Sequence, residues 1–399
     1  MIRHLLKLIW RRKAANSLLA LELLLTFLVL FGLGCLVAGV GLAFRQPPGF
    51  TYKHVWTLRL ATNNDTLPQE PTLLRLQRQL RQQPGVEAVS LAMYSTPFSE
   101  YVMNSTATVA GQPPLVVTEV ETDDQFAALL KMPVLEGRWF DRRDEAAGLP
   151  PVIINQEMRE AFFGNRPALG QRIRLQHSMN ENEKMAGRVV GVVGSYRPGG
   201  DLAPPQPVVF RRRVPPADGT RMFSYTLLVK VKPGAGAALE QQLVRTVTAV
   251  TKTWTVSATP LTDSRALALQ TSLAPLLAVG IVSAFLLLNV ALGLFGMLWQ
   301  AISQRRDEIG LRRALGATAT AIGWQFVAET LVLTTLAVLP GLFVAAQFPL
   351  LGVLGVSAHV YLLGMALALV VLYGFTLLCT LQPSWLAARV QPAVALREE

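Results

Sequence analysis

The sequence has little charge and very little cysteine or histidine. Charged residues make up 16% of its 399 residues, and 51% are hydrophobic. An ordinary soluble domain carries about 25% charged residues. One soluble core cannot cover so much apolar surface, and the same composition excludes an intrinsically disordered chain. Both cysteines, Cys35 and Cys379, lie inside apolar runs, so no disulfide framework is expected.

Motifs for catalysis and cofactor binding are also missing. The chain contains no G-x-x-x-x-G-K-[ST], no G-x-S-x-G and no H-E-x-x-H, which argues against a P-loop, a hydrolase elbow and a zincin site. Its four histidines are scattered, so no histidine-based metal site is predicted. The adjacent acids Asp123/Asp124 and Asp144/Glu145 are interpreted as solvated loop acids rather than a glycosidase-type pair. We therefore predict no catalytic residue, no metal and no cofactor bound by this chain.

Four long apolar runs are the dominant feature. They cover 17–44, 272–300, 321–350 and 360–381. Each exceeds or matches the ~20 residues that a hydrocarbon core requires. The sequence therefore predicts an α-helical integral membrane protein with four transmembrane helices and a large mixed α+β domain, 45–271, between the first and the second. A cleaved signal peptide is the alternative for the first run, but that run is too long and lacks a small-residue cleavage site.

Basic residues in the short connecting segments indicate the orientation. They concentrate in the N-terminal segment 1–16 and in the loop 301–320, whereas the tail 382–399 is mixed. The positive-inside rule then places both termini in the cytoplasm and the 45–271 domain outside the cell's inner, or plasma, membrane. The net charge of +11 partly reflects this topology. No nucleic-acid partner is predicted, because the basic residues do not alternate with aromatic ones.

Alternating and helical patterns predict the elements of the 45–271 domain. Strands are expected over 54–60, 86–93, 151–154, 188–193, 208–210, 225–231 and 253–256, with a hairpin over 107–120. Asn155 is expected to cap a helix over 156–163 that ends at Gly164. Two further helices are expected, one with Leu73, Leu76 and Leu80 on its apolar face and one over 234–251. The segment 197–216, rich in proline and glycine, is expected to be an exposed loop.

Two acids, Glu22 and Glu329, fall inside the predicted spans near their cytoplasmic ends. An ionisable group in a membrane span is a candidate functional residue. A proton relay would need further acids or histidines deeper in the spans, and the sequence has none there. We therefore expect both acids to pair with arginines of the cytoplasmic loop.

That loop contains the most informative segment, 304–318. On a helix, Leu311, Ala314 and Leu315 share one narrow face and the arginines lie opposite, although Ile309 falls among the arginines. Gly316 is expected to end the helix. A basic connecting loop is the simpler interpretation, but the pattern favours a short amphipathic docking helix at the membrane surface.

The loop segment also resembles a family signature. The run 306–317 reads R-x-E-I-G-L-R-R-A-L-G-A and is followed by Phe326 and Glu329. Together with the tail P-x(3)-A-A-x(3)-P-x(3)-L-R over 383–397, it is similar to the MacB/FtsX-like ABC transporter permeases. The 45–271 domain resembles the extracytoplasmic domain of that family in G-R-x-F at 137–140, P-V-I-I-N at 151–155, F-G at 163–164, L-G at 169–170 and V-V-G-V-V at 189–193.

This resemblance implies a permease subunit of the mechanotransmission type, coupling ATP hydrolysis to the export or release of a peptide, lipophilic drug or lipoprotein outside the membrane. Only 16 residues precede the first span, so a separate ABC ATPase is expected to bind ATP and Mg. Other implied partners are a second or homologous permease, membrane lipid, and a periplasmic adaptor or lipoprotein. An FtsX-like regulator of a cell-wall hydrolase is the alternative, followed by a membrane-anchored sensor or enzyme. The implied ATPase-coupling helix comprises Arg305, Arg306, Glu308, Ile309, Gly310, Leu311, Arg312, Arg313, Ala314, Leu315 and Gly316.

Overall fold

The computed structural model describes residues 13–63, 68–99, 101–146, 148–177, 184–214, 222–353 and 356–388. Most of the expected segment 1–16 and of the tail 382–399 therefore lies outside the described residues. The chain divides into two compact units. One, the helical unit, combines residues 1–42 with 273–399, and the other, the insertion unit, comprises residues 43–272.

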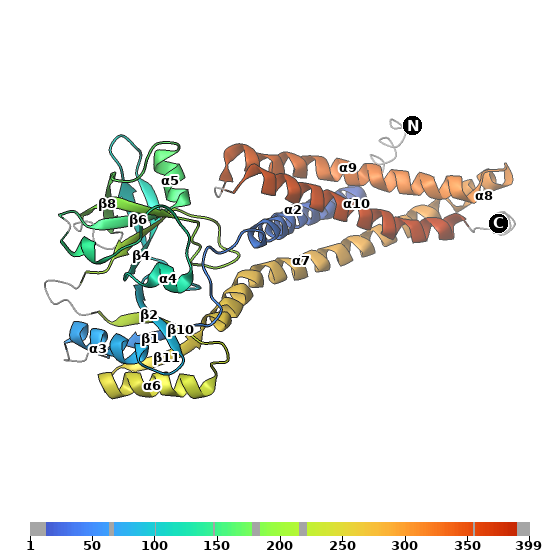
Figure 1. Cartoon of the computed structure of the whole chain (residues 1–399). Helices are drawn as coiled ribbons and strands as arrows, with labels where there is room; N and C mark the ends of the chain where they lie inside the picture. The colour runs from blue at the N-terminus through green and yellow to red at the C-terminus, as the bar shows by residue number, and fades with distance from the viewer. Residues whose placement is uncertain are drawn as a thin grey trace. The chain divides into compact units, whose positions relative to one another are not determined.

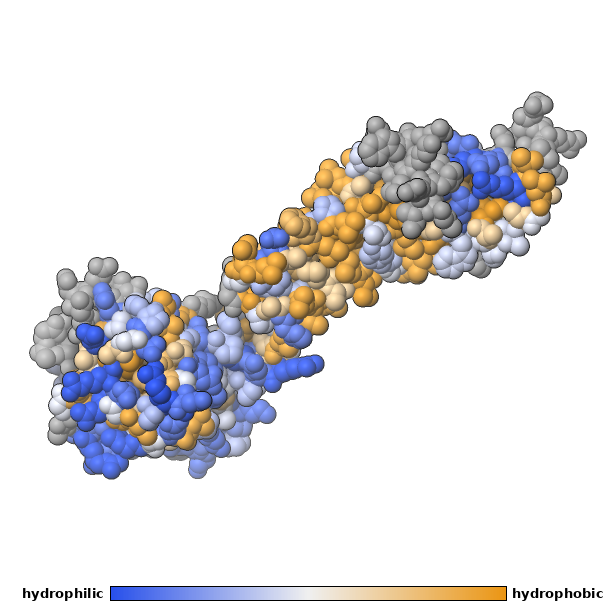
Figure 2. Space-filling model, turned by 90° about the horizontal axis from the view of Figure 1, so that it is seen from above, coloured by the Kyte–Doolittle hydropathy of each residue, from blue (hydrophilic) through white to orange (hydrophobic). Residues whose placement is uncertain are grey.

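The helical unit contains four helices that are long and apolar enough to cross a membrane, among the residues that are described. They belong to α2 (Lys13–Phe44), α7 (Leu261–Gln304), α9 (Ala319–Leu351) and α10 (Ala358–Ala388). These helices coincide with the four predicted spans, and α7 begins well before its apolar run. The surface of this unit is mostly hydrophobic, whereas that of the insertion unit is largely hydrophilic (Figure 2).

Helix α2 contacts each of the other three spans, and glycines allow the close approach. A Cβ built at Gly34 of α2 would lie 2.5 Å from the carbonyl oxygen of Gly364 in α10. A Cβ at Gly341 of α9 would lie 2.6 Å from the Phe27 ring, and one at Gly293 of α7 would lie 3.1 Å from Leu19. Small residues at such crossings let helix backbones pack closely inside a membrane.

The insertion unit is built on an eleven-stranded sheet (Figure 1). Ten strands follow the order β11-β1-β10-β2-β4-β3-β7-β8-β6-β9, with β5 paired to β8 and an additional parallel pairing between β4 and β9. The strands are β1 (Val55–Ala61), β2 (Val86–Met93), β3 (Asn104–Thr108), β4 (Leu115–Thr122), β5 (Val134–Gly137), β6 (Pro151–Asn155), β7 (Arg172–His177), β8 (Lys184–Val193), β9 (Val208–Arg212), β10 (Ser224–Val231) and β11 (Thr255–Pro260).

Helices cover the two ends of this sheet and form separate apolar cores. Helices α3 (Gln69–Arg81) and α6 (Ala237–Thr251) pack leucines such as Leu76 and Leu243 onto β1, β2 and β10. Helix α5 (Gln156–Phe163) packs Met158 and Phe162 over β6–β9. Between them lies a third core, rich in aromatic side chains, which includes the short helix α4 (Phe126–Leu130) and the first residue of α7, Leu261.

Most local predictions for the insertion unit are confirmed. The Asn155 side chain accepts a hydrogen bond from the Met158 amide at 3.1 Å and caps α5, which ends at Gly164 as expected. Strands β3 and β4 form the predicted antiparallel hairpin. The expectation of an exposed loop over 197–216 is wrong at Arg197, which is fully buried, whereas the strand expected at 208–210 is confirmed as part of β9. The proline- and glycine-rich composition correctly indicated a loop around 198–207, but it did not reveal that the Arg197 side chain is buried there.

Candidate functional site

Helix α8 (Arg306–Ala314) forms in the loop between α7 and α9, where the coupling helix was expected. Its end has the geometry that its glycine predicts: Gly316 has a φ of +97°, its amide donates to the Arg313 carbonyl, and the Ala317 amide donates to the Arg312 carbonyl. These two bonds form a Schellman cap, which satisfies the last carbonyls of a helix. The chain can then turn directly into α9.

Ile309 explains how α8 is held. Its side chain is 5% exposed and packs in a small apolar cluster with Leu298 and Ala301 of α7 and with Ile322 and Phe326 of α9. In the sequence Ile309 was the residue that did not fit the apolar face. The structure shows that it lies on the packing face of α8, against the helical unit itself.

Polar contacts tie the same side of α8 to α9. Arg312 pairs with Glu308 and donates to Gln325 at 3.1 Å, and Gln325 donates to Glu329 at 3.2 Å. Arg305 completes the network with an ion pair of 3.1 Å to Glu329. The expected pairing of Glu329 with a loop arginine is therefore confirmed. The Glu329 side chain is 18% exposed, and Arg305 balances its negative charge, as expected for an acid within a membrane-spanning helix.

Glu22 behaves differently from Glu329. Its carboxylate lies beside Gly293 of α7, where a Cβ would come within 3.1 Å of it. Its side chain forms no ion pair with the arginines that the structure describes in the loop. The prediction that both acids pair with loop arginines is thus confirmed for Glu329 alone.

The outer face of α8 is apolar and uncovered. Leu311 is 56% exposed and Leu315 is 80% exposed, and Ala314 beside them is exposed as well. Because Ile309 and the polar network already hold the opposite side, this leucine pair is available to a second surface. The sequence pattern proposes these two leucines as apolar anchors, and both are exposed.

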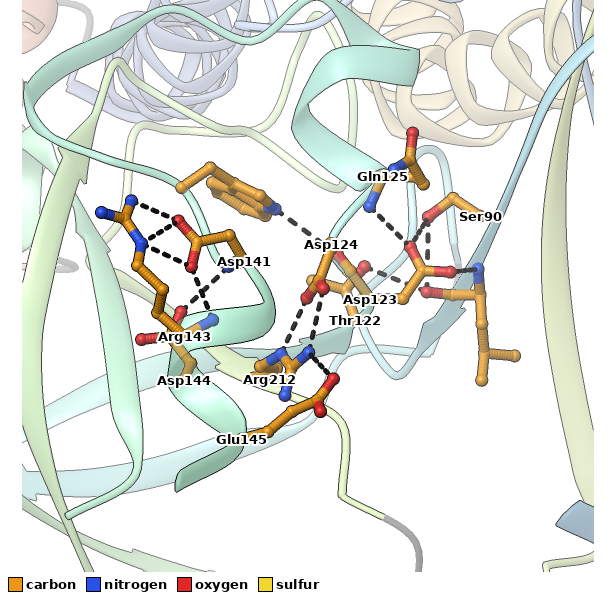
Figure 3. Close-up of polar contacts among 12 residues, drawn as sticks. Ser90, Thr122, Asp123, Asp124, Gln125, Asp141, Arg143, Asp144, Glu145 and Arg212 are labelled. Atoms are coloured by element: carbon orange, nitrogen blue, oxygen red, sulfur yellow. Dashed lines mark hydrogen bonds and ion pairs between the residues drawn. The ribbon is translucent and has the colours of Figure 1, made fainter. Parts of the chain in front are cut away.

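Three of the four adjacent acids of the insertion unit, Asp123, Asp124 and Asp144, are paired or buried rather than solvated, contrary to expectation (Figure 3). Asp123 accepts hydrogen bonds from the Ser90 hydroxyl at 2.6 Å and from the Leu91 amide at 2.8 Å, and burial raises its pKa. Asp124 turns away and pairs with Arg212 at 2.7 Å. Asp144 is 8% exposed and pairs with Arg138 at 2.6 Å. Glu145 is exposed, as expected of a solvated acid, and it also contacts Arg212, at 3.4 Å.

The ion pair of Asp144 makes stability depend on pH. Hydrogen bonds from Arg138 lower the pKa of Asp144 below its ordinary value of 3.8. Because the lowered pKa belongs to the folded state, the pair stabilises the protein above pH ~4 and that stabilisation is lost as the pH falls through the folded pKa.

We expect Asp144→Asn to destabilise the full chain at pH 7 by about 1–2 kcal/mol, since one partner is buried and the other half-exposed. The difference in melting temperature from wild type should shrink between pH 5 and pH 3. The control Glu160→Gln changes an exposed acid of α5 and should have little effect at either pH. A destabilisation by Asp144→Asn that is the same at pH 7 and pH 3 would contradict the proposed ionisation.

No group of three or more histidine, cysteine, aspartate or glutamate side chains able to hold a metal occurs among the described residues. The feature that stands out instead is α8, a short helix that packs against α7 and α9 through Ile309 and leaves Leu311 and Leu315 exposed.

Comparison with known proteins identifies the family. Residues 27–246, more than half of the chain, match the model of the MacB-like periplasmic core domain, and residues 280–392 match that of the FtsX-like permease C-terminal region. The chain belongs to the MacB/FtsX-like ABC transporter permeases. It is thus a membrane protein of a family whose permease part is not itself catalytic.

Individual relatives are distant. The chain is 26% identical to the macrolide export ATP-binding/permease protein MacB of Marinobacter nauticus, over 70% of this chain and 43% of the relative. It is also 26% identical to the pyoverdine export ATP-binding/permease protein PvdT of Pseudomonas syringae, over 69% and 42%. It thus spans less than half the length of these two relatives. The uncharacterized ABC transporter permease YvrN of Bacillus subtilis is 26% identical over 69% of both chains.

Among solved structures, the periplasmic region of MacB from Actinobacillus actinomycetemcomitans covers 54% of this chain and 92% of its own length, with 12% identity and a TM-score of 0.38. The extracellular domain of the ABC-type transporter YknZ covers 50% of this chain and 99% of its own, with 17% identity and a TM-score of 0.34.

Proposed function

We propose that this chain is the permease subunit of a mechanotransmission-type ABC transporter and works with a separate ATPase subunit. The observation that carries the proposal is α8, which is held to α7 and α9 by Ile309 while Leu311 and Leu315 stay exposed. The 399 residues contain no P-loop, so ATP must be bound by another polypeptide segment. The relative YvrN, itself named a permease, supports placing that segment in a different subunit.

In this mechanism the ATPase closes on ATP and moves α8. Helix α7 is one continuous helix from Leu261 to Gln304, and only Arg305 separates its last residue from α8. Its first residue, Leu261, is fully buried in the aromatic core of the insertion unit. Motion of α8 is thereby passed along α7 to the insertion unit, and no solute has to pass between the spans.

The proposal includes partners and a substrate class. Two permeases, identical or homologous, would pair on two ATPase subunits, with ATP and Mg bound only by the latter. The names of the relatives, macrolide export and pyoverdine export, favour export or release of a lipophilic drug, peptide or lipoprotein. A periplasmic adaptor or lipoprotein would then receive the substrate.

The proposed orientation places both termini in the cytoplasm and the insertion unit outside the inner membrane. It predicts opposite labelling of two exposed positions in a chain whose native cysteines, Cys35 and Cys379, are replaced by alanine. Ala249→Cys, on α6, should react with a membrane-impermeant thiol reagent in intact cells with a permeabilised outer layer. Ser303→Cys, near the end of α7, should react only after the membrane is opened. The reverse pattern would refute the orientation.

Purification tests the proposal as a whole. An affinity-tagged chain isolated from its own cells should carry an ABC ATPase in equal amount, and the complex should hydrolyse ATP. The chain alone, in nanodiscs, should show no hydrolysis. Hydrolysis by the isolated chain, or isolation without any ATPase under conditions that keep membrane complexes intact, would refute it.

A further inference from the structure

Arg197 is a buried cation that binds the end of another element. It lies in the 195–203 segment of the insertion unit, and its side chain is fully buried. Its guanidinium donates to the Ala203 carbonyl at 3.0 Å, to the Ala43 carbonyl at 3.4 Å and to the Gln46 carbonyl. Ala43 is in the last turn of α2, and Gln46 lies two residues beyond the end of that helix.

These bonds satisfy groups that a helix end leaves unpaired. The last four carbonyls of an α-helix have no partner within the helix, and the C-terminal end of its dipole attracts a positive charge. No basic residue occurs in the last turn of α2 itself. Arg197 supplies that charge from a segment about 150 residues further along the chain.

The backbone reinforces this contact. The Arg197 amide donates to the Pro48 carbonyl at 3.0 Å. Gly49 has a φ of +87°, and a Cβ there would lie 1.6 Å from the Ser195 carbonyl oxygen. The backbone that follows α2, at Pro48 and Gly49, therefore packs directly against the 195–203 segment.

The same segment also holds the start of α7. Asp201, 8% exposed, pairs with Arg265 in the second turn of α7 at 2.5 Å. The Arg265 guanidinium lies over the Tyr52 ring, 4.9 Å from its centroid. Asp201 also acts electrostatically on Arg197, opposing the effect of burial, which lowers the pKa of Arg197. All of these residues belong to the insertion unit.

We propose that Arg197 and Asp201 form a clamp that joins the end of α2 to the start of α7, so that the two helices act on the insertion unit together. The inference rests on the proposed function, because coupling α2 to α7 has a role only if the two helices transmit motion to the insertion unit. Burying a cation without a directly bonded carboxylate is costly, and an apolar side chain of similar size often serves a fold equally well or better. Arg197 is therefore assigned as a positioning residue rather than a source of fold stability.

Hydrogen exchange on the full chain in nanodiscs tests the clamp without any ATPase. Arg197→Met should raise exchange in two separate segments, 45–52 and 261–268, by roughly tenfold or more, as expected for the loss of buried bonds to a charged group. Asp201→Asn keeps the carbonyl bonds of Arg197 and should raise exchange at 261–268 alone. The matched control is Arg213→Met, because the Arg213 side chain is only 6% exposed and binds Glu70 of α3. It should leave both segments unchanged.

If Arg197→Met loosens 45–52 but not 261–268, Arg197 holds α2 alone and the clamp does not exist. If Arg197→Met and Arg213→Met alter both segments equally, the effect is general destabilisation and the inference fails as well.

A second measurement separates this inference from the proposed function. In the complex with its ATPase, Mg, ATP and vanadate should change exchange in the insertion unit of the wild type. Arg197→Met should abolish that change while the complex stays intact. No change in the wild type would refute the proposed function, leaving the clamp to be judged by the first measurement. A change that persists in Arg197→Met would refute the clamp as a coupling element.

Discussion

Replacing Gly364 with leucine should force α2 away from α10 and prevent the helical unit from assembling. A Cβ at Gly364 would lie 2.5 Å from the Cys35 sulfur and 2.7 Å from the Cys35 amide nitrogen. The sulfur can turn aside, but the amide belongs to the backbone of α2 and cannot move without moving the helix. Overpacking typically costs about 1–3 kcal/mol where side chains can adjust. A backbone collision should cost at least that much.

The effect would be measured as the amount of protein in the membrane and as its melting temperature in detergent. Gly374→Leu is the matched control, because it lies on the same helix and a Cβ there would meet no atom of another segment within 4 Å. It should resemble wild type in both measurements. Equal behaviour of the two variants would show that the contact between Gly34 and Gly364 does not hold α2 in place.

The features that the sequence predicted correctly depend on local patterns. Four apolar runs of sufficient length indicate four membrane helices whatever they pack against. Asn155 before an apolar stripe and Gly316 after one indicate where α5 begins and where α8 ends, because each satisfies backbone groups of its own helix.

The features that the sequence did not reveal depend on contacts between distant segments. Nothing around Gly364 indicates that Cys35, more than 300 residues earlier, lies against it. Arg197 stands in a segment rich in proline and glycine, and its burial follows from the path of residues 43–49. Adjacent acids such as Asp123 and Asp124 were assigned to solvent because their partners come from β2 and β9.

Helix α8 depends both on a local pattern and on contacts between distant segments. Its position, its length and its glycine end follow from the local pattern, but the direction it faces does not. A helical projection correctly placed Ile309 among the arginines, opposite Leu311 and Leu315, but it could not show that Phe326 and Leu298 make that side the packing face. Once Ile309 is assigned to the packing face, Leu311 and Leu315 stand out as the large exposed apolar side chains among the residues of this segment whose burial is described.

Leu311→Asp should therefore separate the permease from its ATPase while leaving the chain folded. At 56% exposure Leu311 contributes little to the helical unit, so membrane accumulation and melting temperature should match wild type. In a complex, the new carboxylate would be buried in a small interface without a partner, at a cost of about 2–4 kcal/mol, or a loss of affinity of roughly 30-fold to 1,000-fold. Co-purification with the ATPase and the rate of ATP hydrolysis in nanodiscs would measure both effects.

Two further variants distinguish docking from a general effect of added charge. Val116→Asp places the same carboxylate at an exposed apolar position of β4, 65% exposed, and should leave the complex unchanged. Ile309→Asp buries a charge among Leu298, Ile322 and Phe326, so it should lower the melting temperature of the chain itself. If Leu311→Asp retains wild-type association and hydrolysis, α8 is not the coupling element. The segment would then be only a basic loop that sets the topology.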